Sequence, residues 1–323
     1  MKTFTRISLS SLSMFMLTSL MASCSPAEEQ ALEVHTFTSD GSGFDTHSYW
    51  VDTGREVVVF DAQFTPALAE QMRAEIRSLT ASPVRYVVVT HPNPDKFNGA
   101  SVFQAEGATL VASSETAAAM PGVHAYKEAY FTGVGMFAEG TYPALPTVDM
   151  TFDGTLRLEL DADVDITLHT LSGPGVSSTQ TVALLQGAVI AGDLFANQVH
   201  AWLEGGIVEG APRPTLESWQ AMLDEVTRLS DAAAQVYPGR GEPAPLEEAS
   251  AAQQLYLETM EGLVETYVNT LPDAAEALTG EQASTHYANI TAEAEKAFPT
   301  YGLSYLVSYG VYGLALQKAG VLE

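Results

Sequence analysis

The stretch VVVTHPNPDKFNGASVF, Val87 to Phe103, places four polar side chains within six residues of the end of an apolar run. They are His91, Asn93, Asp95 and Lys96. An imidazole and a carboxylate are metal ligands, whereas an amide oxygen is a weak ligand for zinc and a protonated lysine offers no electron pair. The loop therefore carries part of a metal site, and its chemistry depends on partners from elsewhere in the chain.

The elements around this loop are predicted to form a β-α-β unit. Two strand-like runs between residues 33 and 62 precede a helix with Thr65 as the expected N-cap and Pro66 at its first position. The continuous apolar run VRYVVVTH, residues 84–91, is typical of a strand that is covered on both faces. Chemistry in such a unit is expected beyond the carboxyl end of the second strand, which is where His91 to Lys96 lie.

The rest of the chain is predicted to hold more strands and then mainly helices. Residues 115–120 predict a short helix, and residues 121–146 predict a long loop or lid, because glycine, proline and aromatic residues occur there without a period. Short strands from Asp149 onward, separated by turns, predict a β-meander. A helix over residues 215–229 and a mostly helical region from residue 246 complete the prediction.

The composition is strongly acidic. The 323 residues carry 40 Asp and Glu against 14 Lys and Arg, a formal charge of −26, with 46% apolar residues. This charge repels nucleic acid and leaves no basic stripe on which nucleic acid could dock. The composition therefore indicates a globular protein that does not bind nucleic acid.

The N-terminus predicts a secreted protein with a lipid anchor. Residues 1–23 have a basic start, a short apolar run and small residues before Cys24, which is the one cysteine of the chain. This arrangement resembles the lipobox of bacterial lipoproteins, and a lone cysteine has no internal disulfide partner. We expect a signal peptide over 1–23, acylation of Cys24, a tether over 24–33, and a location in the bacterial cell envelope with a membrane contact through lipid.

Four phrases in order resemble the metallo-β-lactamase superfamily: VVVTHPNPDKFNGA, SGPGVSST, VIAGDLF and VYPGRGEP. They resemble its strand and His-x-His-x-Asp-His loop, its Gly-His-Ser/Thr turn, its Gly-Asp strand end and its Pro-Gly-His-Gly loop. The resemblance implies an αββα sandwich, an α/β fold, over residues 34–246, with residues 247–323 as a helical C-terminal extension. It also implies a hydrolase ancestry with two zinc ions.

Carried over position by position, the metal ligands of that family are mostly replaced. Three of the ligand positions keep a residue that can bind a metal ion: His91, Asp95 and Asp193. The other ligand positions hold residues of different chemistry: Asn93, Lys96, Val176 and Arg240. Two of these replacements, Lys96 and Arg240, bring positive charge beside two carboxylates, which predicts a salt-bridge cluster in place of the second zinc.

Two functions follow from this resemblance. The first is a lipid-anchored binding or accessory protein that has lost its dizinc centre, needs no cofactor, and uses the former cleft for a small-molecule ligand. The second is a hydrolase with one divalent metal, such as zinc, on His91, Asp95 and Asp193, in which Asp95 and His91 are the candidate catalytic residues. His200 resembles part of a His-Pro-Trp-Leu phrase of one branch of the family and is a candidate pocket residue. The sequence leaves the oligomeric state open.

Overall fold

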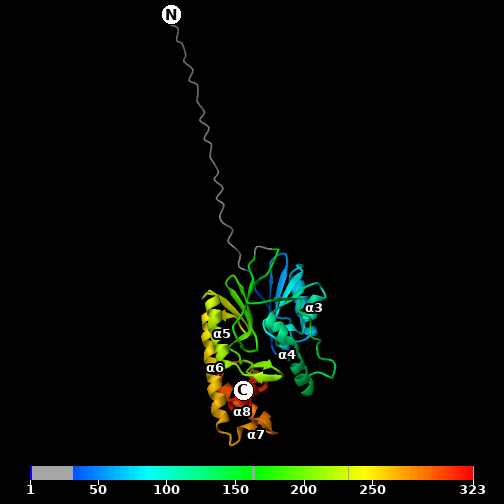
Figure 1. The fold of residues 1–323 in the computed structure, drawn as a ribbon. Helices are drawn as coiled ribbons and strands as arrows, with labels where there is room; N and C mark the ends of the chain where they lie inside the picture. The colour runs from blue at the N-terminus through cyan, green and yellow to red at the C-terminus, as the bar shows by residue number, and fades with distance from the viewer. Residues whose placement is uncertain (2–31, 162–163, 232, 323) are drawn as a thin grey trace. The chain divides into compact units, whose positions relative to one another are not determined.

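The computed structural model describes residues 1, 32–161, 164–231 and 233–322, and residues 31–323 form one compact unit. This unit contains two six-stranded sheets that lie side by side in the centre of Figure 1. The first sheet has its strands in chain order: β1 (His35–Thr38), β2 (His47–Asp52), β3 (Val57–Phe60), β4 (Val84–Val88), β5 (Thr109–Ser113) and β6 (Met150–Phe152). Strands β3 to β6 pair in parallel with one another, whereas β2 pairs antiparallel with both β1 and β3.

The second sheet is built mainly from a meander and one parallel pair. Its order is β14 (Ala244–Pro245), β13 (Gln235–Gly241), β10 (Ala188–Asn197), β9 (Thr181–Leu185), β8 (Thr167–Thr170) and β7 (Thr155–Arg157). Strands β7 to β10 pair antiparallel, and β10 pairs parallel with β13. A short hairpin of β11 (Gly206–Val208) and β12 (Ala211–Arg213) and a single 3-10 turn at Gly41–Gly43 lie outside both sheets.

Successive side chains of a strand point to opposite faces of its sheet, and this alternation places them in two different apolar layers. In β3, Val57 and Val59 belong to the apolar cluster beneath helices α1 (Pro66–Leu79) and α3 (Ala100–Gln104), whereas Val58 and Phe60 belong to the cluster between the two sheets. Every residue of β3 is therefore buried, which is why its sequence is a continuous apolar run. Thr65 caps α1 by accepting a hydrogen bond from the backbone of Leu68, and Pro66 occupies the first turn, as predicted.

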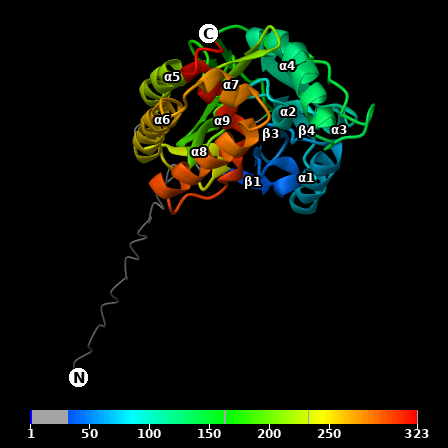
Figure 2. The same ribbon diagram turned by 90° about the horizontal axis from the view of Figure 1, so that it is seen from below.

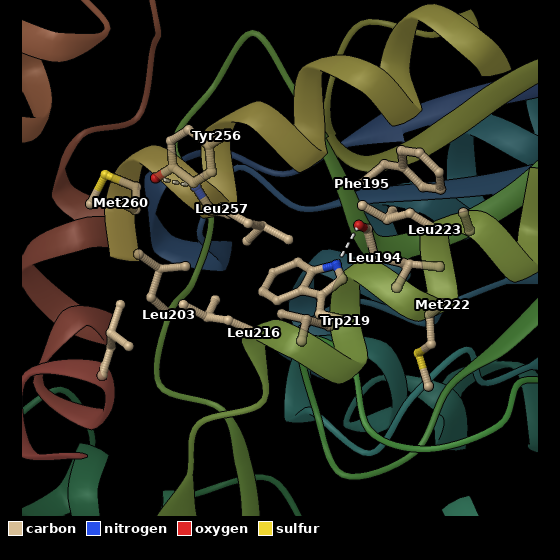
Figure 3. Close-up of a cluster of buried hydrophobic side chains, with 14 of the residues drawn as sticks. Leu194, Phe195, Leu203, Leu216, Trp219, Met222, Leu223, Tyr256, Leu257 and Met260 are labelled. Atoms are coloured by element: carbon tan, nitrogen blue, oxygen red, sulfur yellow. Dashed lines mark hydrogen bonds between the residues drawn. The ribbon is translucent and has the colours of Figure 1, made fainter. Parts of the chain in front are cut away.

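The outer face of the second sheet is covered by α5 (Leu216–Leu229) and α6 (Leu246–Val268), which flank it on the side opposite α3 and α4 in Figure 1. Figure 3 shows Trp219 at the centre of this layer, where its indole nitrogen donates a hydrogen bond to the carbonyl oxygen of Leu194, 2.9 Å away. The family fold predicted from the motifs is thus present, with helices outside two packed sheets.

The C-terminal region is helical, as predicted. It continues from α6 through α7 (Ala274–Thr279), α8 (Ala283–Ala297) and α9 (Tyr305–Lys318), which lie together at one end of the sandwich in Figure 2. Buried residues of α8 and α9 belong to the same apolar cluster as α5 and α6. Across the described parts of the chain, no helix combines the length and the apolar character that crossing a membrane would require.

The prediction of a loop or lid over residues 121–146 is wrong for its first half. Helix α4 runs from Ser114 to Gly133 and passes through Pro121. Its buried positions are spaced by three or four residues, but Lys127 is one of them, and a lysine on the buried face conceals the apolar period. Residues 134–149 carry no helix or strand, so only this second half is a loop.

The prediction of an uninterrupted meander from residue 149 is also wrong at its start. Strand β6 pairs in parallel with β5 and therefore belongs to the first sheet. The chain crosses to the second sheet between Phe152 and Thr155, at a turn where Gly154 has a φ of +65°. A turn of this kind looks the same in sequence whether the next strand stays in its sheet or leaves it.

Candidate functional site

Lys96, in the short helix after β4, lies between two carboxylates. Its Nζ is 2.7 Å from Oδ1 of Asp193 and 2.8 Å from Oδ2 of Asp95. The Lys96 side chain is completely buried, and the two aspartates are 6% exposed. One ammonium thus bridges the carboxylates of two different elements, the helix after β4 and strand β10.

Arg240 completes the arrangement from strand β13. Its Nη1 is 2.6 Å from Oδ2 of Asp193, and its Nη2 is 3.1 Å from Oδ2 of Asp95. The guanidinium also donates to the hydroxyl of Thr46 and to the carbonyl oxygen of Phe44, at 2.8 and 2.7 Å. We call the four charged residues the ion-pair centre: Asp95, Lys96, Asp193 and Arg240.

Two glycines make the approach of these elements possible. A Cβ atom at Gly239 of β13 would lie 1.8 Å from Oδ1 of Asp193, so a side chain there would displace that carboxylate. Gly192 has a φ of +54°, and a Cβ atom there would lie 2.4 Å from the hydroxyl oxygen of Thr90. The glycines in the phrases AGD and PGRG are therefore required by close contact around Asp193.

His91 lies beside the ion-pair centre, and Thr90 and Asp61 fix the position of its ring. Its Nδ1 is 3.0 Å from the hydroxyl oxygen of Thr90, and that hydroxyl donates to the carboxylate of Asp61 at 2.9 Å. Its Nε2 is 3.7 Å from Oδ2 of Asp193 and has no hydrogen-bond partner among the described residues. Burial lowers the pKa of His91 to about 4, so its imidazole is neutral at pH 7. Burial also raises the pKa of Asp61 to about 7.

The charges within the ion-pair centre stabilise each other. Burial acts to raise the pKa of Asp193, but Arg240 and Lys96 outweigh burial and hold this pKa far below its usual value. Burial acts in the same direction on Asp95, and the same two cations again keep its pKa low. Burial acts to lower the pKa of Lys96, but the two carboxylates raise it above the usual value. All four groups are therefore charged at pH 7.

The other residues singled out in the sequence lie around this centre with different roles. Asn93 accepts a hydrogen bond from the hydroxyl of Ser177, at 3.3 Å. Val176, next to Ser177, is buried in the apolar cluster of the second sheet. His200 is fully buried, and its Nδ1 is 3.2 Å from the hydroxyl of Tyr256 in α6. Cys24 lies outside the described residues.

Above the ion-pair centre is a cavity of about 30 Å³ with aromatic walls. Its floor includes Asp95 and Arg240, and its walls are the rings of Phe44, Phe64, Phe131 and Trp202. Ring centroids are 5.1 Å apart for Phe44 and Phe64 and 6.0 Å apart for Phe44 and Trp202. A second, smaller space of about 10 Å³ lies between His200, Asp193 and Arg240, so His200 is close to the centre.

Lys127 and Glu204 form a buried ion pair beside the cavity that sequence reasoning missed. Both side chains are 3% exposed, and Glu204 also accepts hydrogen bonds from the Trp202 indole, at 2.9 Å, and from the hydroxyl of Tyr312 in α9. Lys127 is one of five lysines in the chain. Its position on the same helical face as Phe131, four residues further on, was the available signal.

Thr46 is the second residue that the sequence did not reveal. Its hydroxyl donates to Oδ2 of Asp95 at 2.8 Å and accepts from Nη2 of Arg240 at 2.8 Å. A threonine before an ordinary strand carries no sequence signal for such a role. The loop that holds it is fixed by Gln63, whose amide nitrogen donates to the carbonyl oxygen of Thr46 at 3.1 Å.

Comparison with known proteins places this site within one family. Residues 41–239, more than half of the chain, match the family model described as "Metallo-beta-lactamase superfamily". A metallo-beta-lactamase from Pontibacter korlensis is a structural neighbour with a TM-score of 0.54 and 19% identity, over 71% of this chain and 95% of that chain. The structure of TMB-1 is a second neighbour, with a TM-score of 0.51 and 16% identity, over 71% of this chain and 98% of that chain. A comparison with curated sequences found no significant match. The chain belongs to the metallo-beta-lactamase superfamily.

Proposed function

We propose that this protein is a metal-independent member of its superfamily that serves as a binding or accessory protein, not as a hydrolase. The observation that carries the proposal is the position of Lys96, whose ammonium lies within 2.8 Å of both Asp95 and Asp193. A cation that belongs to the protein thus neutralises the carboxylates that would otherwise hold a metal ion. The former metal centre becomes a structural ion-pair centre.

The donor set does not fit two zinc ions. Zinc in proteins is held by three or four strong nitrogen, sulfur or oxygen ligands. Lys96 and Arg240 are protonated and have no electron pair to donate, and the side chain of Val176 has no polar atom. Two zinc ions next to an ammonium and a guanidinium would also face like charges inside a buried site. No catalytic step through zinc follows from these residues.

The alternative, a hydrolase with one divalent metal, has one observation in its favour. Nε2 of His91 is buried, has no hydrogen-bond partner in the described part of the chain, and lies 3.7 Å from Oδ2 of Asp193. A metal ion on His91 would need the carboxylates of Asp95 and Asp193 as further ligands, and both accept from Lys96 and Arg240. Within the described residues, no three His, Cys, Asp or Glu side chains are grouped so that they could hold a metal ion.

A metal-free hydrolytic mechanism has little support in the charges. General acid–base catalysis by two carboxylates requires one of them to be protonated near neutral pH. Lys96 and Arg240 instead keep the pKa of both Asp95 and Asp193 below the usual value. His91 is neutral, but its ring is fully buried behind Asp193. These observations favour binding over catalysis.

The proposal places the protein in the bacterial cell envelope, attached to a membrane through an acylated Cys24. It rests on the N-terminal sequence, which resembles a lipoprotein signal. Several acyl chains on one cysteine are sufficient for stable anchoring. The variant Cys24→Ser is expected to move the protein from the membrane fraction to the soluble fraction. Unchanged sedimentation with membranes would contradict the anchor.

Metal content and thermal stability test the metal-independent function. We expect purified protein to contain far less than one zinc per chain and to keep its Tm in the presence of zinc, manganese, calcium or a chelator. The double variant Asn93→His with Val176→His supplies two further imidazoles near His91 and is the positive control, which we expect to gain zinc. Stoichiometric zinc in the wild type, with loss of stability on chelation, would overturn the proposal.

A further inference from the structure

Asp95 lines the cavity above the ion-pair centre, and one of its carboxylate oxygens forms no hydrogen bond with the described residues. Oδ2 of Asp95 accepts from Thr46 and contacts Lys96 and Arg240, but no donor among the described residues reaches Oδ1. The Asp95 side chain is 9% exposed and lines the cavity. A carboxylate oxygen that keeps acceptor capacity at the wall of a cavity favours a ligand that donates hydrogen bonds.

The cations around the cavity are already paired with carboxylates. Lys96 and Arg240 both pair with the carboxylate of Asp193. Lys127 pairs with Glu204. Four charged side chains line the cavity, Asp95 and Asp193 against Lys127 and Arg240, and Lys96 and Glu204 pair with members of this set, so the cavity carries no excess positive charge. The whole chain, with a formal charge of −26, attracts cations.

The aromatic walls suit an ammonium group. Cations bind favourably over the faces of Trp, Tyr and Phe rings, and more strongly where water is excluded. The protein already contains one example beside the cavity, because Nζ of Lys127 lies 4.9 Å above the ring of Trp202. Phe44, Phe64 and Phe131 provide three further rings around the same space.

We propose that this cavity binds the ammonium end of a primary amine, with the charged group donating to Oδ1 of Asp95 between the rings of Phe44, Phe131 and Trp202. This inference rests on the proposed metal-independent function and names the class of its ligand. The cavity, about 30 Å³, has room for about two water molecules, which is the size of a CH₂–NH₃⁺ end. The rest of such a ligand lies outside, past Asn93 and Trp202, which are only partly buried.

Binding of methylammonium, followed by NMR on uniformly ¹⁵N-labelled protein, tests this inference. We expect saturable shifts of the Trp202 indole and of the Phe44 and Asp95 amides, with a Kd in the millimolar range, as befits a ligand of two heavy atoms. Methanol, which has the same size without the charge, and sodium chloride at the same ionic strength are expected to give no saturable shift. Equal shifts with methanol or acetate, or none with methylammonium, would overturn the inference.

Two substitutions assign the binding to this cavity. Asp95→Asn keeps the shape of the side chain and is expected to weaken methylammonium binding at least tenfold. Because Asp95 also pairs with Lys96, Phe131→Leu is the second variant, and it is expected to weaken binding severalfold by removing one ring. Phe103→Leu makes the same change in the apolar cluster under α1 and is the matched control. Equal affinity of the Phe131 and Phe103 variants would contradict the site.

The measurement is made on protein whose metal content is already known. If the protein is free of metal and does not bind methylammonium, the ligand class is wrong, and the metal-independent function stands. If the protein contains stoichiometric zinc, the proposed function fails whatever the titration shows. Tetramethylammonium is included because its larger head group should bind more weakly in a cavity of this size, and tighter binding than methylammonium would overturn the assignment of a primary amine.

Discussion

Two networks in this protein have the same composition and different surroundings. The ion-pair centre contains two cations and two carboxylates, all at most 9% exposed as side chains. A second network on the outer surface of α1 also contains two cations and two carboxylates, which are 30 to 52% exposed: Glu70, Arg73, Arg77 and Glu106. The N–O distances are similar, between 2.6 and 3.1 Å.

The comparison shows that distance alone does not decide what an ion pair contributes. In the α1 network, water solvates each charge whether or not its partner is present, so each exposed pair contributes between about 0 and 1 kcal/mol. In the ion-pair centre, each charge lost its hydration on folding and depends on its partners. Removal of one member there leaves buried charge that the remaining members no longer balance. Four predictions separate the two networks.

Acid is expected to have the largest effect, because it neutralises both carboxylates of the ion-pair centre and leaves Lys96 and Arg240 without partners. The folded-state pKa values of Asp95 and Asp193 lie below 3.8, so the stability that they contribute is complete above pH 3.8. It is lost as the pH falls through the folded-state values. We expect the free energy of unfolding, measured with urea, to fall steeply below pH 3.8.

Asp61 and His91 act mainly above this pH window, whereas Asp40 and Asp52, whose pKa values are also lowered, lie near the surface and contribute less. Asp61, with a folded-state pKa of about 7, is protonated in both the folded and the unfolded state well below pH 3.8, and His91, at about 4, is charged in both. The double variant R73A/R77A is the control, because it removes the two arginines of α1 that pair with Glu106. Its acid slope should match that of the wild type. A slope that disappears in this variant would assign the acid sensitivity to the surface.

The substitution Lys96→Ala is expected to have the next largest effect. It leaves two carboxylates in contact with Arg240 alone, in a buried site. Breaking a buried ion pair by removing one partner costs about 3–5 kcal/mol. Urea denaturation at pH 7 measures this loss. A loss under about 1 kcal/mol would mean that the ion-pair centre is solvated and behaves like the surface network.

The substitution Arg240→Lys keeps the charge and should cost less. Lysine cannot reproduce the fork that reaches Asp95, Asp193, Thr46 and the carbonyl of Phe44. We expect a loss of about 2 kcal/mol, the scale of one or two hydrogen bonds to charged groups. Full stability in this variant would show that the charge of Arg240 matters and its geometry does not.

The substitution Arg77→Ala on α1 is expected to have the smallest effect, under about 1 kcal/mol, and this effect should decrease as salt is added. Its salt dependence distinguishes it from Lys96→Ala, whose cost should hardly change between low and high salt because the pair is buried. The same urea experiment at two salt concentrations measures both variants. Similar salt dependence in the two variants would remove the distinction between the networks.

Much of the fold could be predicted from the sequence because its signals are local. The cap at Thr65, the proline at Pro66 and the continuous apolar run of β4 each reflect a preference of neighbouring residues. The continuation of helix α4 beyond residue 120 and the sheet to which β6 belongs were missed for the opposite reason. Lys127 is compatible with a buried helical face only because Glu204, 77 residues away, pairs with it, and β6 is assigned to the first sheet only by its pairing with β5.

The sequence by itself determined which chemical groups this protein has at the edge of its sheets. A lysine, an arginine and a valine stand at positions where the family motifs carry metal ligands, and this loss of electron-pair donors can be read without coordinates. The tertiary structure decided what those groups do. It brings Lys96 within 2.8 Å of two carboxylates and adds Thr46 and the cavity rings around them. Such contacts depend on backbone approaches, such as Gly239 against Asp193, between residues far apart in the chain.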